Sequence, residues 1–350
     1  MEQIVIEAAI KSFIPQLVKE SFSFLGKVTN ETKGLFDKSL HKYFTKQTQR
    51  YSYIKTILNG NKPVYLYDIY FPLNLQRNAE IINTDKISNF FINTNFVTIF
   101  GNAGSGKSTL VKHLFINSIV EKYGVPILIE FRYLNDYSGS IEDYITEVIF
   151  ENQVSQSFDI LKKWLKTGKF VFFLDGFDEL NNDIERTILK QLTSFLHKYN
   201  DNKYILTSRP YTNVEFMPLF HNYQIETLGE EQVKRFIKLQ LKNEDELSQK
   251  IIQSVENTSQ TYITSFLSNP LLLSLYILTF QSNPDIPNKK YIFYRRVVQA
   301  LFTEHDSKSK LGYIRQRRSK LNQEQFEEVL KRFSFLSFFE IKYILTLIMY

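Results

Sequence analysis

The segment from residue 96 to residue 109 reads Phe96-Val-Thr-Ile-Phe-Gly-Asn-Ala-Gly-Ser-Gly-Lys-Ser-Thr109. Its first five residues form the short apolar run of a buried strand. Residues 101–108 then fit the pattern G-x-x-x-x-G-K-[ST] completely. A helical pattern follows from Ser108 to about Tyr123. Strand, glycine-rich turn and helix in this order predict a phosphate-binding loop, which we favour over a chance glycine-rich turn.

Each part of this loop has a physical role. Glycines let backbone N–H groups turn toward a phosphate without a Cβ clash. The following helix directs its positive N-terminal dipole at the same group. Lys107 supplies a cation for the β and γ oxygens, and Ser108 offers a hydroxyl to Mg²⁺. The predicted nucleotide-binding residues are Gly101, Asn102, Ala103, Gly104, Ser105, Gly106, Lys107, Ser108 and Thr109.

A second site is predicted where the apolar run Phe170-Val-Phe-Phe-Leu174 meets Asp-Gly-Phe-Asp-Glu179. An acidic residue at the carboxyl end of a buried strand lies where open α/β sheets bind ligands. We therefore expect Asp175 to hold Mg²⁺ together with Ser108. Asp178 and Glu179 follow within reach of a γ-phosphate and a water, and we expect a catalytic role for both. A solvated acidic turn is the alternative for these two residues.

A third site is predicted at Thr207-Ser-Arg-Pro210, directly after another apolar run. If that run lies between the first and third strands of the sheet, its polar residues face the γ-phosphate. Arg209 would then sense or neutralise the phosphate charge, and we count it among the catalytic residues. The alternative is a surface turn closed by proline.

The wider pattern predicts an α/β fold. Further strand candidates at 125–130, 170–174, 203–207 and 223–226 are separated mostly by helical patterns, which indicates a parallel sheet covered on both faces. Residues 64–72 also have strand-like aromatic and β-branched content. The expected units are an N-terminal helical segment (1–60), a phosphate-loop domain (61–228), a helical domain (229–288) and a last module (289–350).

Composition narrows the class of protein. Hydrophobic residues make up 43% and charged residues 23%, a globular balance. The absence of cysteine excludes a disulfide scaffold and a cysteine nucleophile, and five histidines without HExxH or paired spacing argue against catalytic zinc. No uninterrupted apolar stretch is long enough to span a bilayer and the start is no secretory signal, so we expect a cytoplasmic protein without membrane contact.

Positive charge is concentrated near the C-terminus. Residues 289–332 carry 12 Lys/Arg and 5 Asp/Glu, whereas the whole chain has a net charge of +6. The stretch 308–320 is therefore a candidate for nucleic-acid binding, although a solvated charged face is the commoner explanation. The chain ends in the apolar segment 344–350, from which we expect the last module to be incomplete.

Together these motifs resemble a known family. The sequences GNAGSGKS, FLDGFDEL and ILTSRP resemble those of the NACHT group of signal-transduction ATPases, the STAND class, which includes NOD-like receptors and bacterial anti-phage proteins. Residues 268–275 are similar to the family's first helical domain, which implies that Pro270 lies near the adenine. Residues 290–306 resemble the entry to its winged-helix region. The resemblance covers roughly residues 60 to 340.

The resemblance implies a fold and a function. The parallel sheet would have the order 5-1-4-3-2, and 289–350 would be a winged-helix-like module. ATP and ADP with Mg²⁺ would be the cofactors, ADP holding a closed monomer and ATP an open, homo-oligomeric state with slow hydrolysis. The setting would be bacterial immunity, with an unidentified trigger for which a phage component is a candidate. The alternatives are a P-loop kinase or other small-molecule NTPase, and a nucleic-acid-binding ATPase.

Overall fold

The computed structural model describes residues 1–25, 30–60, 62–149, 158–257, 261–282, 290–307 and 323–339. The chain divides into two compact units, Met1–Asp285 and Ile286–Tyr350. In the second unit the described residues form two helices, α12 (Lys290–Ser307) and α13 (Gln323–Phe339). The basic stretch 308–320 and the apolar end from residue 340 lie outside the described residues. The winged-helix interpretation of 289–350 therefore stays a prediction.

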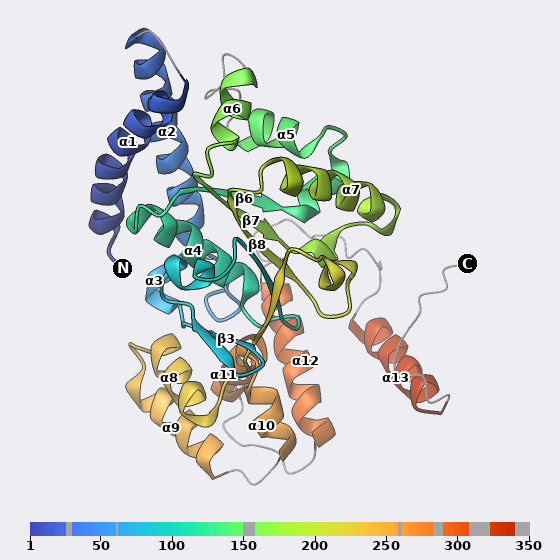
Figure 1. Ribbon diagram of the computed structural model, residues 1–350. Helices are drawn as coiled ribbons and strands as arrows, with labels where there is room; N and C mark the ends of the chain where they lie inside the picture. The colour runs from blue at the N-terminus through green and yellow to red at the C-terminus, as the bar shows by residue number, and fades with distance from the viewer. Residues whose placement is uncertain are drawn as a thin grey trace. The chain divides into compact units, whose positions relative to one another are not determined.

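The first unit is built on a seven-stranded sheet (Figure 1). Its strands are β3 (Asn74–Arg77), β4 (Glu80–Asn83), β5 (Phe96–Phe100), β6 (Val125–Glu130), β7 (Phe170–Asp175), β8 (Lys203–Ser208) and β9 (His221–Ile225). They lie in the order β4-β3-β9-β5-β8-β7-β6. The five strands from β9 to β6 are parallel. This confirms the α/β fold and the predicted order 5-1-4-3-2.

Helices cover both faces of the parallel strands. Every residue of β5 and of β7 is buried, as both faces of a doubly covered sheet require. Helix α4 (Lys107–Val120) connects β5 to the edge strand β6. The chain then returns toward β5 through α5 (Ile141–Tyr144), α6 (Phe158–Leu165) and α7 (Asn182–Lys198). A right-handed crossover places its helix on one face of the sheet when the chain moves outward to β6, and on the opposite face when the chain returns toward β5. Helix α4 therefore lies on one face, and α5, α6 and α7 lie on the other.

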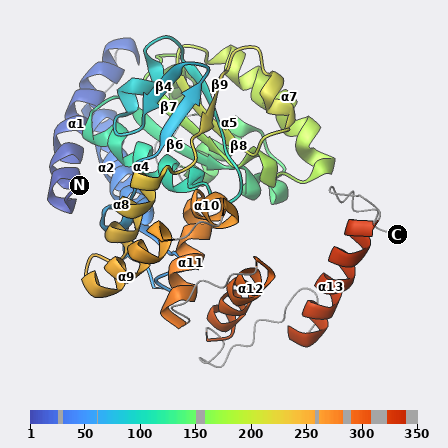
Figure 2. The same ribbon diagram turned by 90° about the horizontal axis from the view of Figure 1, so that it is seen from below.

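Two N-terminal helices pack on the α4 side of the sheet. Helices α1 (Gln3–Leu25) and α2 (Asn30–Tyr51) contact each other and α4, as Figure 2 also shows. Phe13 and Phe44 stack between them with ring centroids 5.9 Å apart. The buried hydroxyl of Tyr43 donates a 2.7 Å hydrogen bond to the carbonyl of Pro126 and so ties α2 to β6. These helices occupy most of the segment that the apolar spacing predicts to be helical.

The strand predicted over 64–72 is wrong beyond its first two residues. Only β2 (Val64–Tyr65) is extended, pairing with β1 (Tyr53–Ile54), and the chain then turns into the short helix α3 (Leu66–Ile69). The aromatic residues that suggested a strand instead pack around a helix. Aromatic content favours a half-buried surface and does not fix the backbone that presents it.

Sequence reasoning missed the antiparallel extension of the sheet. Strands β3 and β4 form a hairpin whose turn holds Asn78 in the left-handed region, at φ 55°. The hairpin joins β9 through the pairs Leu75–Ile225 and Gln76–Gln224. Both strands are short and rich in polar residues, so neither carries a strong alternating pattern.

In the described residues of the first unit, four helices follow the sheet, as the pattern after Leu228 predicts. They are α8 (Glu230–Gln240), α9 (Asp245–Glu256), α10 (Thr261–Leu267) and α11 (Pro270–Ser282). Pairs α8·α9, α10·α11 and α9·α11 are in contact, and α8 also contacts α3. No helix in the described part of the chain combines the length and hydrophobicity that a bilayer span requires.

A buried histidine joins α4 to the segment around α3. The ring of His113 stacks on Tyr70 with centroids 4.2 Å apart and meets Tyr67 edge to face. Its Nε2 lies 3.3 Å from the carbonyl oxygen of Asp85. Burial lowers the pKa of His113 to about 4, so the imidazole is neutral in the folded protein near neutral pH.

This pKa predicts a loss of stability in mild acid. In the unfolded chain His113 takes up a proton near pH 6.5, whereas the folded state resists protonation down to about pH 4. The contribution of His113 to stability is therefore fully present above pH 6.5 and is lost as the pH drops, by up to about 3 kcal/mol at pH 4. Urea unfolding between pH 4 and 7.5 measures this loss. In His113→Phe the free energy of unfolding should depend less on pH over this range. In the control variant His221→Asn it should depend on pH as in wild type.

Candidate functional site

The predicted phosphate loop folds as its glycines require. Between β5 and α4, Gly104 and Gly106 adopt φ of 75° and 95°, a region that side chains rarely enter. A Cβ on Gly101 would lie 2.5 Å from Oγ of Ser105. Substitution at any of these three positions would therefore deform the loop or its packing.

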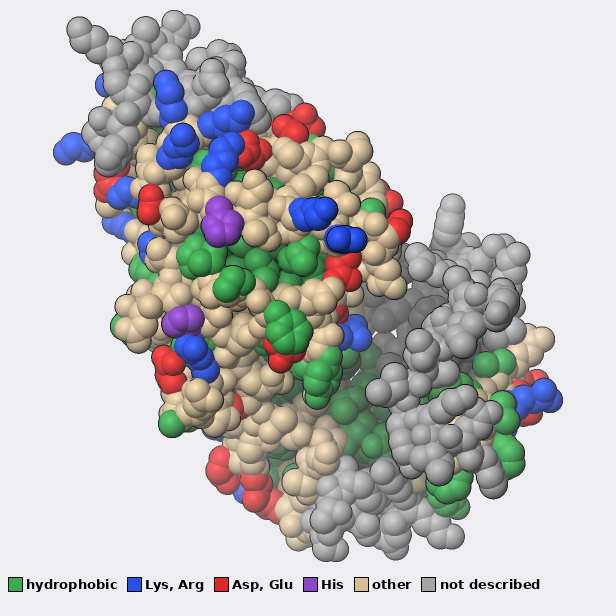
Figure 3. All heavy atoms as spheres, turned by 45° about the vertical axis from the view of Figure 1, so that its right-hand side comes forward, with side chains coloured by type: hydrophobic (Ala, Val, Ile, Leu, Met, Phe, Trp, Pro, Cys, Tyr) green, Lys and Arg blue, Asp and Glu red, His purple; other side chains and the backbone are tan. Residues whose placement is uncertain are grey.

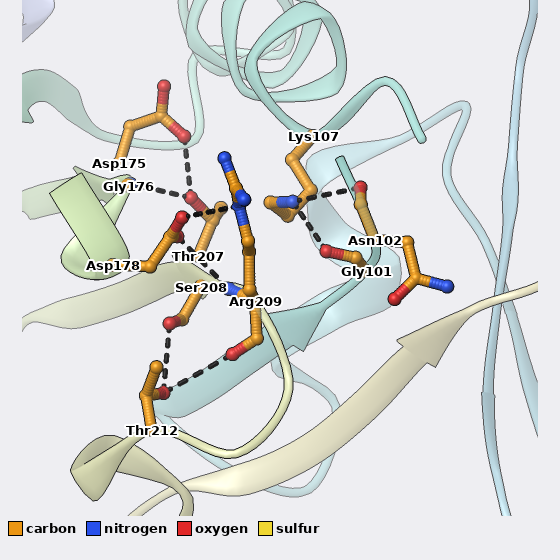
Figure 4. Close-up of polar contacts among 10 residues, drawn as sticks. All are labelled: Gly101, Asn102, Lys107, Asp175, Gly176, Asp178, Thr207, Ser208, Arg209 and Thr212. Carbon is orange, nitrogen blue, oxygen red and sulfur yellow. Dashed lines mark hydrogen bonds and ion pairs between the residues drawn. The ribbon is translucent and has the colours of Figure 1, made fainter. Parts of the chain in front are cut away.

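The side chain of Lys107 folds back over the loop (Figure 4). Its Nζ donates hydrogen bonds to the carbonyl oxygens of Gly101 (2.6 Å) and Asn102 (3.3 Å). Burial lowers the pKa of Lys107, while nearby Asp178 opposes this shift and Arg209 adds to it. The Lys107 ammonium group thus lies at the mouth of the loop, close to carboxylates and hydrogen-bonded to two uncharged carbonyl oxygens.

Asp175 ends β7 in a fixed orientation. The hydroxyl of Thr207, at the neighbouring position of β8, donates a 2.5 Å hydrogen bond to Oδ1 of Asp175. The same hydroxyl oxygen accepts a 2.9 Å hydrogen bond from the backbone N–H of Gly176 (Figure 4). Asp175 is 8% exposed, so one carboxylate oxygen is held by the sheet while the residue still borders the pocket beside Ser108.

Asp178 and Arg209 form a two-point ion pair. The backbone N–H of Arg209 donates to Oδ1 of Asp178 at 3.0 Å, and its Nε lies 2.8 Å from Oδ2. The Asp178 side chain is 12% exposed, whereas that of Arg209 is 58% exposed. The carboxylate is therefore committed to the arginine, and the guanidinium retains room to reach another anion.

Glu179 lies in a different environment from Asp178. Its carboxylate accepts no hydrogen bond from any residue that the structure describes. Partial removal of water raises the pKa of Glu179; the charge of Arg132 opposes this, and Asp175 and Asp178 add to it. A carboxylate with a raised pKa and no fixed partner is suited to accept a proton.

Asn135 and Arg132 were not anticipated from the sequence. Asn135 Nδ2 donates to the carbonyl of Glu179 at 2.9 Å, and Asn135 Oδ1 accepts from the N–H of Asn181 at 2.8 Å. Asn135 thus holds the C-terminal end of the acidic turn on either side of Leu180. Arg132 pairs with Glu130, which also lies 3.4 Å from Arg50 of α2. The contacts of Asn135 and of Arg50 join segments about 45 to 80 residues apart, and no local pattern signals them.

All the predicted site residues except Gly101, Asn102 and Pro270 border one pocket of about 260 Å³. It is lined by Ala103, Gly104, Ser105, Gly106, Lys107, Ser108, Thr109, Asp175, Gly176, Asp178, Glu179 and Arg209. Gly101 and Asn102 support it from behind through Lys107. Acidic and basic groups therefore face the same space above the loop.

A second pocket of about 280 Å³ adjoins the first. The two share Gly104, Gly106 and Thr109, and the walls of the second are mostly apolar. Pro270, predicted to lie near an adenine, lines this second pocket. A charged pocket next to an apolar one has the two-part character of a nucleotide site.

The start of α11 also holds the phosphate loop, which the sequence did not reveal. Asn269 Nδ2 donates to the carbonyl oxygen of Ala103 (3.1 Å). The backbone N–H of Leu271 donates to the carbonyl oxygen of Gly104 (3.2 Å). Asn269 Oδ1 accepts from the N–H groups of Leu271 and Leu272 and so caps the helix. A Cβ on Gly104 would lie 2.4 Å from Cβ of Leu271. The helical region and the loop are therefore in direct contact.

Comparisons with known proteins give one family match and several similar solved structures. Residues 95–244 match the family model of the NACHT domain. No curated protein matches the sequence. Among solved structures, the chain is similar to a STAND (Signal Transduction ATPase with Numerous Domains) protein with a tetratricopeptide repeat sensor from Pyrococcus horikoshii, at 17% identity and a TM-score of 0.35. That match covers 58% of this chain and 30% of the other, so this chain spans less than a third of its length.

Two further solved structures are similar at lower identity. PCH-2 of C. elegans is 12% identical with a TM-score of 0.34, over 83% of this chain and 73% of that one. AMPPCP-bound DnaA from Aquifex aeolicus is 12% identical with a TM-score of 0.29, over 74% of this chain and 98% of that one.

The hydroxyl of Thr207 is predicted to stabilise the site and the fold. Thr207→Val keeps the shape but leaves the buried N–H of Gly176 and Oδ1 of Asp175 without this partner. We expect the free energy of unfolding to fall by about 1–3 kcal/mol. Thr193→Val, on the exposed side of α7, is the matched control and should change it by less than about 0.5 kcal/mol. Equal urea midpoints for both variants would contradict this role.

Proposed function

We propose that the protein, whose residues 95–244 match the family model of the NACHT domain, is a cytoplasmic signalling switch that binds ATP and hydrolyses it slowly. One observation carries the proposal. The phosphate loop, Asp175, Glu179 and Arg209 border one charged pocket, and an apolar pocket adjoins it across the loop. This arrangement fits a nucleoside triphosphate whose base and phosphates occupy the two pockets.

The residues at the loop fit a Mg²⁺–nucleotide complex. Gly104 and Gly106 leave the loop open toward the pocket, and Lys107 can exchange its two carbonyl partners for phosphate oxygens. Ser108 and Asp175, which border the same pocket, would hold Mg²⁺. The ion supplies neutralisation of phosphate charge. Thr207 fixes the orientation of the Asp175 carboxylate for that role.

The two acids of the turn are proposed to act differently. Glu179, with its raised pKa and free carboxylate, is the candidate to take a proton from the attacking water. Asp178 instead holds Arg209 beside the pocket. A γ-phosphate would compete with Asp178 for the guanidinium, so we propose that Arg209 senses whether ATP or ADP is bound.

The contacts of α11 support a switch rather than a simple turnover enzyme. Asn269 and Leu271 bond the outward carbonyls of the phosphate loop, so the position of the helical region depends on the loop. We propose that ADP favours the closed arrangement and that exchange for ATP favours an open one that forms homo-oligomers. The resemblance of the motifs supports the further proposal that this switch acts in bacterial immunity against phage, with an unidentified trigger.

Nucleotide binding is predicted to depend on Lys107. Lys107→Ala removes the cation that faces the phosphates and leaves the core of the sheet untouched. Loss of charge-assisted hydrogen bonds should weaken ATP binding by about 10- to 100-fold. Calorimetry with Mg²⁺ and ATP measures the affinity. Lys190→Ala, on the exposed face of α7, should bind like wild type, and equal affinities for all three proteins would sink the assignment.

Hydrolysis is predicted to depend on Glu179 more than binding does. Glu179→Gln keeps the size of the side chain but removes the base, and should slow hydrolysis by roughly 100-fold or more. ATP affinity should change by less than about threefold, because a base acts mainly in the transition state. Because the pKa of Glu179 is raised, the acid limb of the rate profile should lie above pH 4.5.

Phosphate release and calorimetry on the same preparations test this split. Glu215→Gln, at an exposed position outside both pockets, is the control and should hydrolyse like wild type. If Glu179→Gln instead abolishes ATP binding, Glu179 is a metal ligand and the assigned role is wrong.

A further inference from the structure

The apolar pocket beside the phosphate loop contains a polar side chain that the proposed function does not yet use. Gln240, the last residue of α8, lines this pocket together with Phe236, Pro270 and Leu271. Phe236 meets Phe71 edge to face on the same wall. A planar base is suited to such walls, and the few polar groups among them determine which base is accepted.

Two other polar side chains of the wall, Thr56 and Ser274, already have partners within the protein. Oγ1 of Thr56 accepts from the backbone N–H and the side-chain amide of Asn59. The Ser274 hydroxyl donates to the carbonyl of Pro270. These two side chains are therefore poorly placed to select a ligand by hydrogen bonding.

The amide of Gln240 has a fixed orientation. Its Nε2 donates a 2.9 Å hydrogen bond to the carbonyl oxygen of Ile69, at the end of α3. Rotating the amide by 180° would set Oε1 against that carbonyl oxygen, two acceptors in contact, so the opposite orientation is disfavoured. Oε1 accepts no hydrogen bond from any residue in the described part of the chain. Gln240 therefore offers an acceptor to a ligand in the pocket.

We infer that Gln240 makes this pocket selective for adenine over guanine by accepting a hydrogen bond from the 6-amino group of the base. Guanine carries a carbonyl oxygen at position 6, which would face Oε1 as a second acceptor. The inference rests on the proposed function, because it takes the phosphates to occupy the neighbouring pocket. It adds a residue outside the phosphate loop that determines the nucleotide.

The test compares three nucleotides that differ at position 6 of the base. ATP, purine riboside triphosphate (which lacks the amino group) and GTP are titrated with Mg²⁺ into the full chain by calorimetry. For wild type we expect ATP to bind about 2- to 10-fold more tightly than purine riboside triphosphate, the value of one hydrogen bond, and GTP to bind more weakly than both. This comparison needs no variant, so it does not depend on the folding of one.

A substitution assigns the selectivity to Gln240. Gln240→Met keeps the length of the side chain without its amide. This variant should bind ATP and purine riboside triphosphate with equal affinity, and its affinity for GTP should be closer to its affinity for ATP than in wild type. Gln253→Met, an exposed glutamine of α9 outside the pocket, is the matched control and should keep the wild-type order.

Two outcomes would overturn the inference, and they are distinguishable. If ATP binds but Gln240→Met keeps the wild-type ratio of ATP to purine riboside triphosphate, another group reads the base and the proposed function stands. If none of the three nucleotides binds wild type, the proposed function fails and the inference fails with it.

Discussion

A phosphate-binding loop must turn its N–H groups inward, and its carbonyls then need donors elsewhere. In this protein those donors come from two directions. Lys107 bonds the carbonyls of Gly101 and Asn102, and the start of α11 bonds those of Ala103 and Gly104. A buried or crowded carbonyl without a hydrogen-bond partner is costly. The need to supply donors to the loop carbonyls therefore links the loop, α4 and the helical region.

The charges around the loop follow from the sheet order. Because β8 lies between β5 and β7, Thr207 reaches Asp175, and Arg209 reaches Asp178. Basic and acidic side chains lie near one another over the first unit on the face drawn in Figure 3. Pairing of this kind lets a site hold several carboxylates and cations together, each with a distinct chemical environment.

The parts of the fold that could be predicted are those whose signal lies within one contiguous segment of the sequence. The loop at 101–108, the acidic end of β7 and the buried strands each occupy one segment, and their periodicity is strong. The hairpin of β3 and β4 could not be predicted, because its stability comes from pairing with β9, about 150 residues later. Asn135 and Asn269 escaped notice for a related reason: each acts on a backbone carbonyl of a distant segment. A single asparagine in a sequence does not indicate which backbone carbonyl its side chain will hydrogen-bond in the folded protein.

The capping contact at Asn269 has a mechanical consequence. One amide group both caps a helix and bonds the loop, so the two cannot separate without breaking the bonds from Asn269 Nδ2 and the Leu271 N–H to the loop carbonyls. If the loop binds phosphate as proposed, thermodynamic reciprocity applies. The free energy that a bound phosphate adds to the docking of α11 is then the free energy by which displacement of α11 weakens phosphate binding. In the proposed switch, displacement of α11 and loss of the nucleotide are therefore two outcomes of one coupled equilibrium.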